Sequence, residues 1–479
     1  MAEGVLHYHC YSRLYRDSVA LMALAAELES LDGVLQAGAM MATAANQRIL
    51  KASGMMESDL AVEPDDLYLA VRATSPEAAA AALEHADTVL TAKTAQVGDT
   101  SLTFKPATIA EACELVDAQV AAISVPGAYA ASVAQSALNQ GLHVFCFSDN
   151  VSVEDESALK AFAAKRKLLM MGPDCGTALL AGTPLGFANE VELGSVALVA
   201  ASGTGAQEIS TLASKAGVGI SHIIGVGGRD LSGKINFPTT FTALDLLDQD
   251  PAVSQIVIVS KPPAPEMIEK LVAHCQTLSK PVMACLLGAP ETNEPIAIYS
   301  TLERAAHALI EACGKSTEAL SAYQSSNLDK LTPAPGAEIY GLYTGGTLAH
   351  EAHILCDNAG VRNTILDLGD DEYTQGRPHP MISPDLRCQM IEKATDTKVL
   401  LLDVVLGWGA SHNPAADAAR AVKNLRQNNP AVQVLASITG TDRDHQNIVT
   451  QRELLQEAGI AVFESNGAAV RRAIELVGA

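Results

Sequence analysis

Aromatic residues are scarce in this 479-residue chain: Phe, Tyr and Trp together make up 4% of it, and there is one Trp. Ala, Val, Leu and Gly must therefore fill the interior, which suits the buried strands of parallel α/β proteins. The chain is 48% hydrophobic and 18% charged. This balance excludes an intrinsically disordered protein and predicts sizeable cores.

Positive charge is also scarce. Lys and Arg number 32 against 55 Asp and Glu, which gives a formal net charge of −23. Such a surface argues against nucleic acid or an anionic membrane as a partner. Binding of an anionic substrate would therefore need local positive potential, supplied by helix N-termini and a few Arg or Lys side chains.

Long apolar runs and paired cysteines are missing as well. No run approaches the roughly 20 residues that a membrane span needs. The N-terminus has no basic region followed by an apolar core and a cleavage site. The nine cysteines are scattered without a CxxC pair, so we expect a cytoplasmic protein without a metal site or membrane association.

What the chain does contain is a strand–turn–helix–strand unit that occurs twice. An apolar run ends before Ser202-Gly203-Thr204-Gly205, and helical spacing follows as far as Gly217. The second copy carries Gly345-Gly346-Thr347 in the same place. Thr204 and Thr347, Glu208 and Glu351, and Gly217 and Gly360 correspond at one offset of 143 residues. We interpret the pair as an internal repeat.

Each Gly-Thr turn predicts an anion site. Backbone N–H groups at a helix start lie beside the positive end of the helix dipole, where phosphate is the usual occupant. The alternative is that both turns are ordinary strand–helix connections whose small residues permit close packing. The predicted phosphate-binding residues are Ser202, Gly203, Thr204, Gly205, Gly345, Gly346 and Thr347.

The pattern of strands and helices predicts an α/β fold with several three-layer, parallel-sheet domains. A small N-terminal α/β domain is expected over residues 1–105 and a Rossmann-like domain over 106–190. Two further α/β domains, which contain the repeat, are expected over 191–331 and 332–479. Asn150 follows a strand of the Rossmann-like block and is expected to line a ligand cleft, because ligands bind at strand ends in such sheets. An empty, vestigial cleft is the alternative.

Several motifs resemble the FdrA family, whose members are related to succinyl-CoA synthetase. The resemblance covers nearly the whole chain. It implies a CoA-binding-like domain at 106–190 and flavodoxin-like ligase domains at 191–331 and 332–479, with both helix starts facing one pocket. The motifs are Phe147-Ser148-Asp149-Asn150-Val151, Gly172-Pro173-Asp174-Cys175-Gly176-Thr177, Ala201-Ser202-Gly203-Thr204-Gly205, Gly227-Gly228-Arg229-Asp230, Ser260-Lys261-Pro262-Pro263 and Gly376-Arg377-Pro378-His379-Pro380.

The chain departs from the synthetase in one loop. The synthetase carries its phosphohistidine there, whereas the loop Gly288-Ala289-Pro290-Glu291-Thr292-Asn293 has no histidine. No nucleotide-binding ATP-grasp domain is visible either. Some FdrA-type proteins are associated with oxamate carbamoyltransferase activity, together with companion subunits and a carbamate kinase. This chemistry exchanges a carbamoyl group between a ureido acid and phosphate, and needs neither a phosphohistidine nor ATP in this chain.

The resemblance therefore implies a subunit of a phosphate-dependent carbamoyltransferase that requires no cofactor of its own. Ureido acid and phosphate are the expected small molecules. Companion subunits, a downstream carbamate kinase and a homo-oligomer are the expected partners. The alternatives are an NDP-forming acyl-CoA synthetase, which would bind CoA, and a non-catalytic scaffold subunit.

Candidate catalytic and binding side chains lie after strand ends. Arg229 and Lys261 are expected to supply counter-charge, Arg229 first because its planar fork suits phosphate or carboxylate. An Arg229–Asp230 ion network is the alternative. His379 is expected to act as general acid or to hold the carbamoyl oxygen, with His412 as second choice; each has a structural role as its alternative. Asp174 and Cys175 are placed in the binding turn, with Cys175 otherwise a buried small residue.

Overall fold

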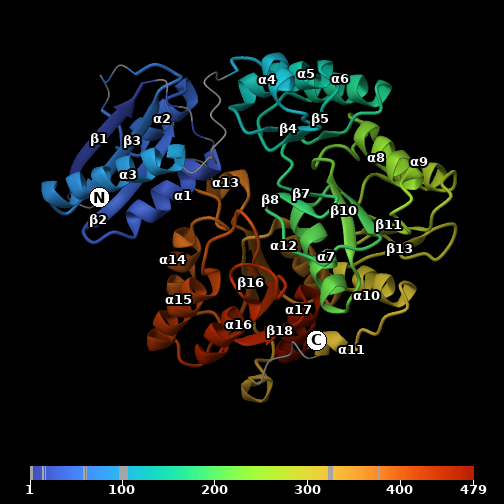
Figure 1. The fold of residues 1–479 in the computed structure, drawn as a ribbon. Coiled ribbons are helices and arrows are strands. Elements are labelled where there is room, and N and C mark those ends of the chain that lie inside the picture. The colour runs from blue at the N-terminus through green and yellow to red at the C-terminus, as the bar shows by residue number, and fades with distance from the viewer. Residues whose placement is uncertain are drawn as a thin grey trace. The chain divides into compact units, whose positions relative to one another are not determined.

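The computed structural model describes residues 4–12, 14, 16, 18–57, 60, 62–95, 106–321, 327–374 and 378–478. The chain divides into two compact units (Figure 1). Unit 1 comprises Met1–Ala107 with Asp371–Ser383, and unit 2 comprises Thr108–Asp370 with Pro384–Ala479. The predicted α/β class is confirmed. Within the described residues, no helix has the length and apolar character that a membrane span requires.

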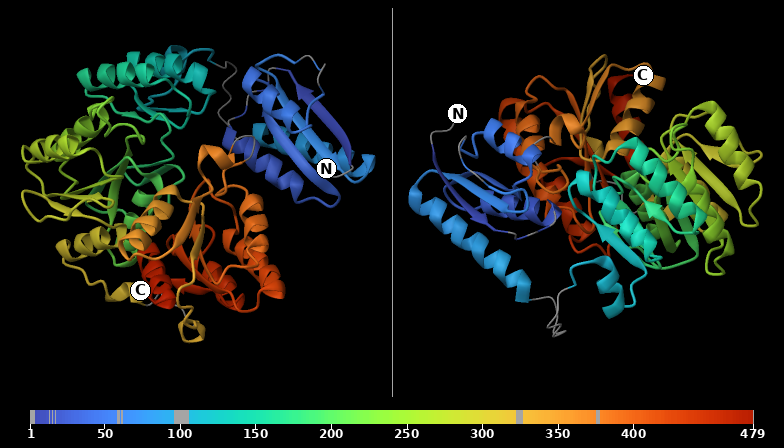
Figure 2. Two further views of the ribbon diagram at one scale, coloured as in Figure 1. Left: turned by 180° about the vertical axis from the view of Figure 1, so that it is seen from behind. Right: turned by 90° about the horizontal axis from the view of Figure 1, so that it is seen from above.

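Unit 1 contains a three-stranded sheet in the order β1-β3-β2. Both outer strands pair antiparallel with β3, which corrects the parallel sheet expected here. Alternating apolar residues specify the buried face of a strand and not the direction of its neighbour. Figure 2 shows α3, in pale blue, along one face of this sheet. The elements are β1 (Val5–Tyr11), α1 (Ser18–Glu29), β2 (Val34–Met41), α2 (Ala44–Ala52), β3 (Leu67–Ala73), α3 (Pro76–Ala95) and α13 (Asp371–Thr374).

Unit 2 begins with a small parallel sheet in the order β4-β5-β6. Its apolar strands pack against helices α5 and α6, as a Rossmann-like half domain requires. The elements are α4 (Ile109–Leu115), β4 (Val120–Ile123), α5 (Gly127–Asn139), β5 (His143–Cys146), α6 (Val153–Lys165) and β6 (Met170–Met171).

The next sheet has seven strands in the order β13-β12-β11-β9-β10-β7-β8. The β7–β8 hairpin joins this sheet through an antiparallel pairing with β10. The predicted boundary after residue 190 therefore differs from the structure, in which the sheet begins at Thr177; this long-range pairing has no local sequence signal. The elements are β7 (Thr177–Leu180), β8 (Thr183–Gly186), β9 (Val196–Ala200), α7 (Gly203–Lys215), β10 (Ile220–Gly225), α8 (Pro238–Gln249), β11 (Gln255–Ser260), α9 (Pro265–Cys275), β12 (Val282–Leu286), β13 (Ala297–Tyr299), α10 (Leu302–Ala312) and α11 (Glu318–Ser321).

The last sheet has five parallel strands in the order β15-β14-β16-β17-β18. Its first βαβ unit repeats that of β9, α7 and β10, so the internal repeat is confirmed. In both sheets the chain crosses from one side of the first strand to the other, which creates a switch point where ligands commonly bind. The elements are η1 (Leu328–Lys330), β14 (Ile339–Tyr343), α12 (Gly346–Asn358), β15 (Asn363–Asp367), α14 (Asp385–Lys393), β16 (Val399–Val405), α15 (Pro414–Asn428), β17 (Gln433–Thr439), α16 (Ile448–Glu457), β18 (Ala461–Phe463) and α17 (Asn466–Val477).

Candidate functional site

Helix α7 begins at Gly203, three residues before the helical spacing in the sequence suggested. Ser202 caps it, because its Oγ accepts a hydrogen bond from the N–H of Gly205 at 3.1 Å. Within the described part of the chain, the N–H groups of Gly203 and Thr204 have no protein acceptor. These two donors are the ones that a helix start offers to an anion.

The start of α12 contacts the start of α7, and the two helices are labelled in Figure 1. The hydroxyl oxygens of Ser202 and Thr347 are 2.6 Å apart, and the Thr347 N–H points at Thr204 Oγ1 at 3.4 Å. A Cβ atom on Gly205 would lie 3.1 Å from the Thr347 methyl group, and one on Gly345 would lie 3.0 Å from the Thr204 methyl group. The prediction that the two turns converge is therefore confirmed.

A small cavity of about 30 Å³ lies at the start of α7. A space of this size holds one or two water molecules, so a phosphate group would have to bind at its mouth. The predicted residues Ser202, Asp174 and Cys175 all line it. The full lining is Asp174, Cys175, Gly176, Thr177, Ala200, Ala201, Ser202, Gly203, Gly225, Gly227 and Gly228.

The start of α12 is occupied by the protein's own carboxylates. Asp403, fully buried within β16, accepts hydrogen bonds from the N–H groups of Thr344 at 2.8 Å and Gly345 at 2.7 Å. It also accepts from Arg387 Nη1 at 3.1 Å. A Cβ atom on Gly346 would lie 2.3 Å from an Asp367 carboxylate oxygen, so Asp367 covers the first turn of the helix.

The two helix starts are consequently unequal although their sequences repeat. In the second copy, Asp367 pairs with Tyr343 of the first strand. Tyr343 corresponds to Ala200 in the first copy, and the residue that pairs with Ala200 is Gly225. Asp403 is the residue after Leu402, which pairs with Leu342. In the first copy the corresponding pair is Val199 and Ile258, and the residue after Ile258 is Val259. The first copy thus has no carboxylate at either position. Phosphate is favoured at α7 and opposed at α12.

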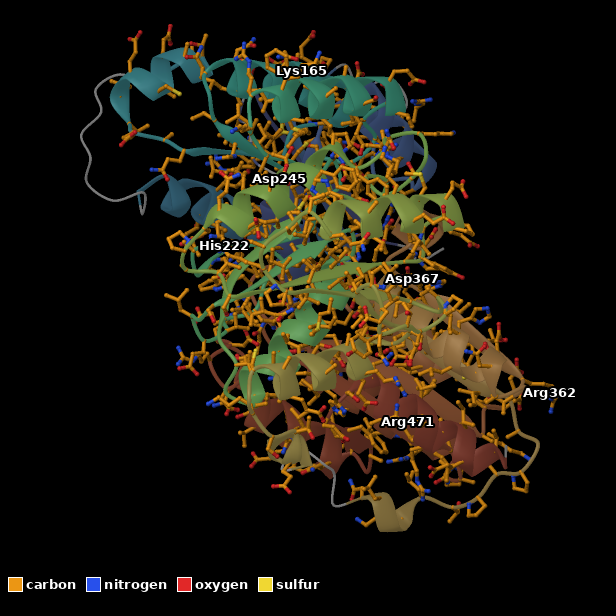
Figure 3. All side chains as sticks on the ribbon, turned by 90° about the vertical axis from the view of Figure 1, so that its right-hand side faces the viewer. Lys165, His222, Asp245, Arg362, Asp367 and Arg471 are labelled. Atoms are coloured by element: carbon orange, nitrogen blue, oxygen red, sulfur yellow. The ribbon has the colours of Figure 1, made fainter. Side chains whose placement is uncertain are left out.

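Lys261 is close enough to the α12 start to influence it. Burial, aided by the negative charge of Asp403, raises the pKa of Asp367 to about 6, although the positive charge of Lys261 opposes this rise. Lys261 also helps to lower the pKa of His350, after burial, which has the largest effect. Figure 3 shows Asp367, the last residue of β15, nearer the middle of the view, and Arg362, which precedes β15, at its margin.

Arg229 takes part in a structural ion network. Its Nε lies 2.7 Å from Glu156 Oε2, and its Nη2 donates to the Val151 carbonyl oxygen at 2.9 Å. Lys160, fully buried in α6, lies 2.8 Å from Glu156 and 2.7 Å from Asp230. These contacts favour the ion-network alternative, with Glu156 in place of Asp230 as the partner of Arg229.

Cys175 has the surroundings of a buried packing residue. Burial raises the pKa of its thiol to about 12, so the thiolate is not available at neutral pH. Asp174 and Asn150 both adopt positive φ angles, 55° and 53°, in the turns beside it. Asp174 N–H donates to the Ser148 carbonyl oxygen at 2.9 Å, so these turns contact each other at the strand ends of the Rossmann-like sheet.

The two candidate histidines lie in different units. His379 lies in the segment Asp371–Ser383, which belongs to unit 1, whereas both helix starts belong to unit 2. Gly376 and Arg377 lie outside the described residues. Burial lowers the pKa of His379 to about 4, and its Nδ1 accepts from the Met381 N–H at 3.2 Å. A neutral ring suits hydrogen-bond donation to a carbonyl oxygen better than general-acid catalysis. His412 is exposed beyond β16, beside His445.

The sequence interpretation missed the reciprocal capping between the two repeats. Glu208 of α7 accepts from the N–H of Asn466, the first residue of α17, at 2.9 Å. Glu351 of α12 accepts from the N–H of Leu302, the first residue of α10, at 2.7 Å. Each half therefore caps a helix of the other, α17 in the second half and α10 in the first. The shared offset of Glu208 and Glu351 was the available signal, but their partners are long-range.

The acidic residues Asp367 and Asp403 were also missed. Asp367 ends β15 and Asp403 lies two residues before the end of β16, near the sheet edge where ligand-contacting side chains gather. This rule identified Lys261 and His412, and it applies equally to Asp367 and Asp403.

Two parts of the chain match known families. Residues 342–476 match the family described as CoA-ligase. Residues 4–105 match the family described as AllF, heavy metal-associated domain. The first match falls on the second copy of the repeat, and the second on unit 1.

Curated proteins and solved structures are similar over longer stretches. The uncharacterized protein YahF of Escherichia coli is 36% identical over 496 residues, covering 94% of this chain and 95% of YahF. Subunit alpha 1 of the succinate–CoA ligase (ADP-forming) of Archaeoglobus fulgidus is 26% identical over 38% of this chain, which spans 62% of that subunit. Among structures, the dinucleotide-forming acetyl-coenzyme A synthetase 1 of Ca. Korarchaeum cryptofilum aligns with 79% of this chain and 87% of its own, at 18% identity and a TM-score of 0.33.

The described residues of unit 1 do not fit a heavy-metal ion. Soft metals require several thiolate or imidazole ligands in one place. Within the described ranges, no group of three His, Cys, Asp or Glu side chains is placed to hold a metal ion. Cys10 Sγ has Asp66 Oδ2 as a neighbour at 3.7 Å, and burial, with Asp66, raises the pKa of its thiol. We therefore assign no metal chemistry to this unit.

Proposed function

This chain belongs to the succinyl-CoA synthetase-related, FdrA-like family that includes YahF, and on that basis we propose that it is a subunit of a phosphate-dependent carbamoyltransferase. The observation that supports the proposal is the inequality of the two helix starts. One presents unpaired N–H groups and the other presents carboxylates. Transfer of a carbamoyl group to phosphate needs hydrogen-bond donors for the phosphate oxygens and hydrogen-bond acceptors for the carbamoyl N–H groups.

Phosphate would bind at the start of α7. The N–H groups of Gly203 and Thr204 are available for its oxygens, and the helix dipole favours its negative charge. Lys261 supplies a positive side chain nearby, which matters in a chain with a net charge of −23. These groups would position the phosphate oxygen for attack on the carbamoyl carbon.

The ureido acid would lie toward α12. The Asp367 carboxylate is a suitable acceptor for the N–H groups of a carbamoyl moiety. In the reaction, the phosphate oxygen forms a bond to the carbamoyl carbon, the bond from that carbon to the amide nitrogen breaks, and the leaving nitrogen gains a proton. With a pKa raised to about 6, Asp367 is partly protonated near neutral pH and is our candidate donor of that proton.

Acyl-CoA synthesis is the second candidate, because residues 342–476 match the CoA-ligase family. Two features oppose it in this chain. The loop from Gly288 to Asn293 offers no histidine to carry a phosphoryl group. Moreover, Asp403 occupies the α12 start and would repel a phosphoryl group bound between the two helices.

The test is carbamoyl phosphate formation from oxalurate and phosphate. It is run with the chain alone and with co-expressed companion subunits, beside an ATP- and CoA-dependent assay for acyl-CoA. We expect carbamoyl phosphate without any need for CoA, and consumption of that product by an added carbamate kinase. Acyl-CoA formation without carbamoyl transfer would overturn the proposal in favour of the second candidate.

A pair of matched variants tests the site. Thr204→Val changes the start of α7, and Thr211→Val makes the same change two turns later, where Thr211 Oγ1 donates to the Glu208 carbonyl oxygen. We expect Thr204→Val to raise the KM for phosphate and Thr211→Val to leave it unchanged. Equal effects of both variants would indicate a structural role for Thr204. No effect of either would favour a non-catalytic scaffold.

A further inference from the structure

The loop that follows β16 is anchored through its backbone. The Trp408 N–H donates to the Ala188 carbonyl oxygen at 2.8 Å. Gly407 and Gly409 on either side have φ angles of 109° and 79°, which only glycine adopts readily. A Cβ atom on Gly407 would lie 2.5 Å from the Ala188 oxygen, and one on Gly409 would lie 2.8 Å from the Phe187 ring. The loop therefore has little freedom to move.

The side chain of Trp408 is nevertheless exposed. It is the one Trp of the chain and is 46% exposed. The ring of His445 lies 5.3 Å from the indole, centre to centre, and the ring of His412 lies 5.7 Å from that of His445. Both imidazoles are exposed as well. Three planar side chains with N–H groups thus lie together: Trp408 and His412 on the loop after β16, and His445 on the loop after β17.

The ring cluster, as we call Trp408, His412 and His445, is connected to the phosphate site by the β7–β8 hairpin. Phe187, which packs against Gly409, donates its N–H to the Gly176 oxygen at 2.7 Å. Its own carbonyl oxygen accepts from Thr177 Oγ1 at 2.7 Å. Gly176 and Thr177 line the cavity at the start of α7. The ring cluster also lies on the loops that follow β16 and β17, two neighbouring strands of the second sheet.

We infer that the ring cluster binds the planar acid substrate, with its conjugated plane stacked on the indole of Trp408 and its carboxylate accepting hydrogen bonds from the imidazole N–H groups. A stacked plane gains both buried area and a favourable ring geometry. A planar ureido acid such as oxalurate, and its amide product oxamate, have the required shape and charge. The identity of this ligand rests on the proposed carbamoyl transfer.

The single Trp provides a direct test, because the intrinsic Trp fluorescence of the full-length chain reports on this loop alone. Oxalurate and oxamate are titrated in the presence of phosphate, and carbamoylglycine serves as a ureido acid whose methylene group breaks the conjugated plane. We expect saturable quenching by the two planar acids and weaker quenching by carbamoylglycine. Calorimetry is then used for the variants. Trp408→Ala is expected to weaken oxalurate binding roughly tenfold, whereas Trp408→Phe retains most of it.

The remaining outcomes separate this inference from the proposed function. Unchanged fluorescence with all three acids, or equal affinity in Trp408→Ala, would overturn the ring cluster as a binding site. If carbamoyl phosphate formation persisted in that variant with an unchanged KM for oxalurate, the proposed function would stand without it. A fluorescence change caused by a companion subunit and by none of the acids would also overturn it, and would assign the loop to a protein interface.

Discussion

At the scale of single residues, Asp403 and Asp367 differ in how firmly they are held. Asp403 accepts from two backbone N–H groups and the Thr344 hydroxyl, and it pairs with the buried Arg387. Among the described residues, the Asp367 side chain accepts one hydrogen bond, from the Gly369 N–H at 2.9 Å. Asp403 is therefore a structural carboxylate, whereas Asp367 is available to a ligand.

This difference predicts opposite outcomes for the same substitution. Asp403→Asn leaves Arg387 buried and unpaired and should lower the free energy of unfolding by about 3 to 5 kcal/mol. Asp367→Asn should leave stability within about 1 kcal/mol of the native chain and lower kcat for carbamoyl transfer. Denaturant unfolding and steady-state kinetics measure the two effects. Equal stability of the two variants would contradict the assignment.

Glu351 gives a pH dependence at the same scale. Burial raises its pKa from 4.5 to about 7. Because the folded-state pKa is raised, its stabilising contribution is complete below the unfolded value and is lost as the pH rises through about 7. The free energy of unfolding should fall by on the order of 3 kcal/mol over that window. In Glu351→Gln this fall should be absent, and an unchanged pH profile of stability would refute the assignment.

At the scale of elements, the residue pattern predicted the repeated strand–turn–helix units, and the family resemblance implied the convergence of their starts. Glycine and threonine spacing is a local signal, and buried strands such as β9 have the apolar runs that reveal them. The inequality of the two starts was not predicted, because it depends on strand register. Only the pairing of β15 and β16 with β14 brings Asp367 and Asp403 to Gly346 and Gly345.

Helix α6 provides an element-scale prediction. Its Lys160 is fully buried between Glu156 and Asp230, whereas the Arg229 side chain is 44% exposed. Lys160→Met should therefore lower the free energy of unfolding by about 3 to 5 kcal/mol, and Arg229→Ala by about 1 kcal/mol or less. Thermal unfolding checks both. If Arg229→Ala abolished carbamoyl transfer while the protein stayed folded, Arg229 would regain its predicted catalytic role.

At the scale of the whole molecule, the two ligase-type halves of unit 2 are capped reciprocally through Glu208 and Glu351. A substitution that destabilises one half should therefore also destabilise the other. Glu208→Ala removes the acceptor for the Asn466 N–H and the Thr439 hydroxyl, and should destabilise unit 2 by about 2 to 3 kcal/mol. The exposed Glu311→Ala in α10 is the control.

Scanning calorimetry distinguishes cooperative from independent halves. We expect unit 2 to unfold in one transition that Glu208→Ala moves to lower temperature as a whole, with no shift for Glu311→Ala. Separation of that transition into two, with one part unmoved, would mean that the halves unfold independently and that the reciprocal capping contributes little to their coupling.

The meeting of α7 and α12 within a single polypeptide has a consequence for dilution. When two helices belong to separate subunits, their encounter depends on protein concentration. Here each helix experiences the other at a high effective concentration fixed by the connecting chain. The phosphate site should therefore persist at nanomolar protein, and any loss of activity on dilution would measure the dissociation of companion subunits instead.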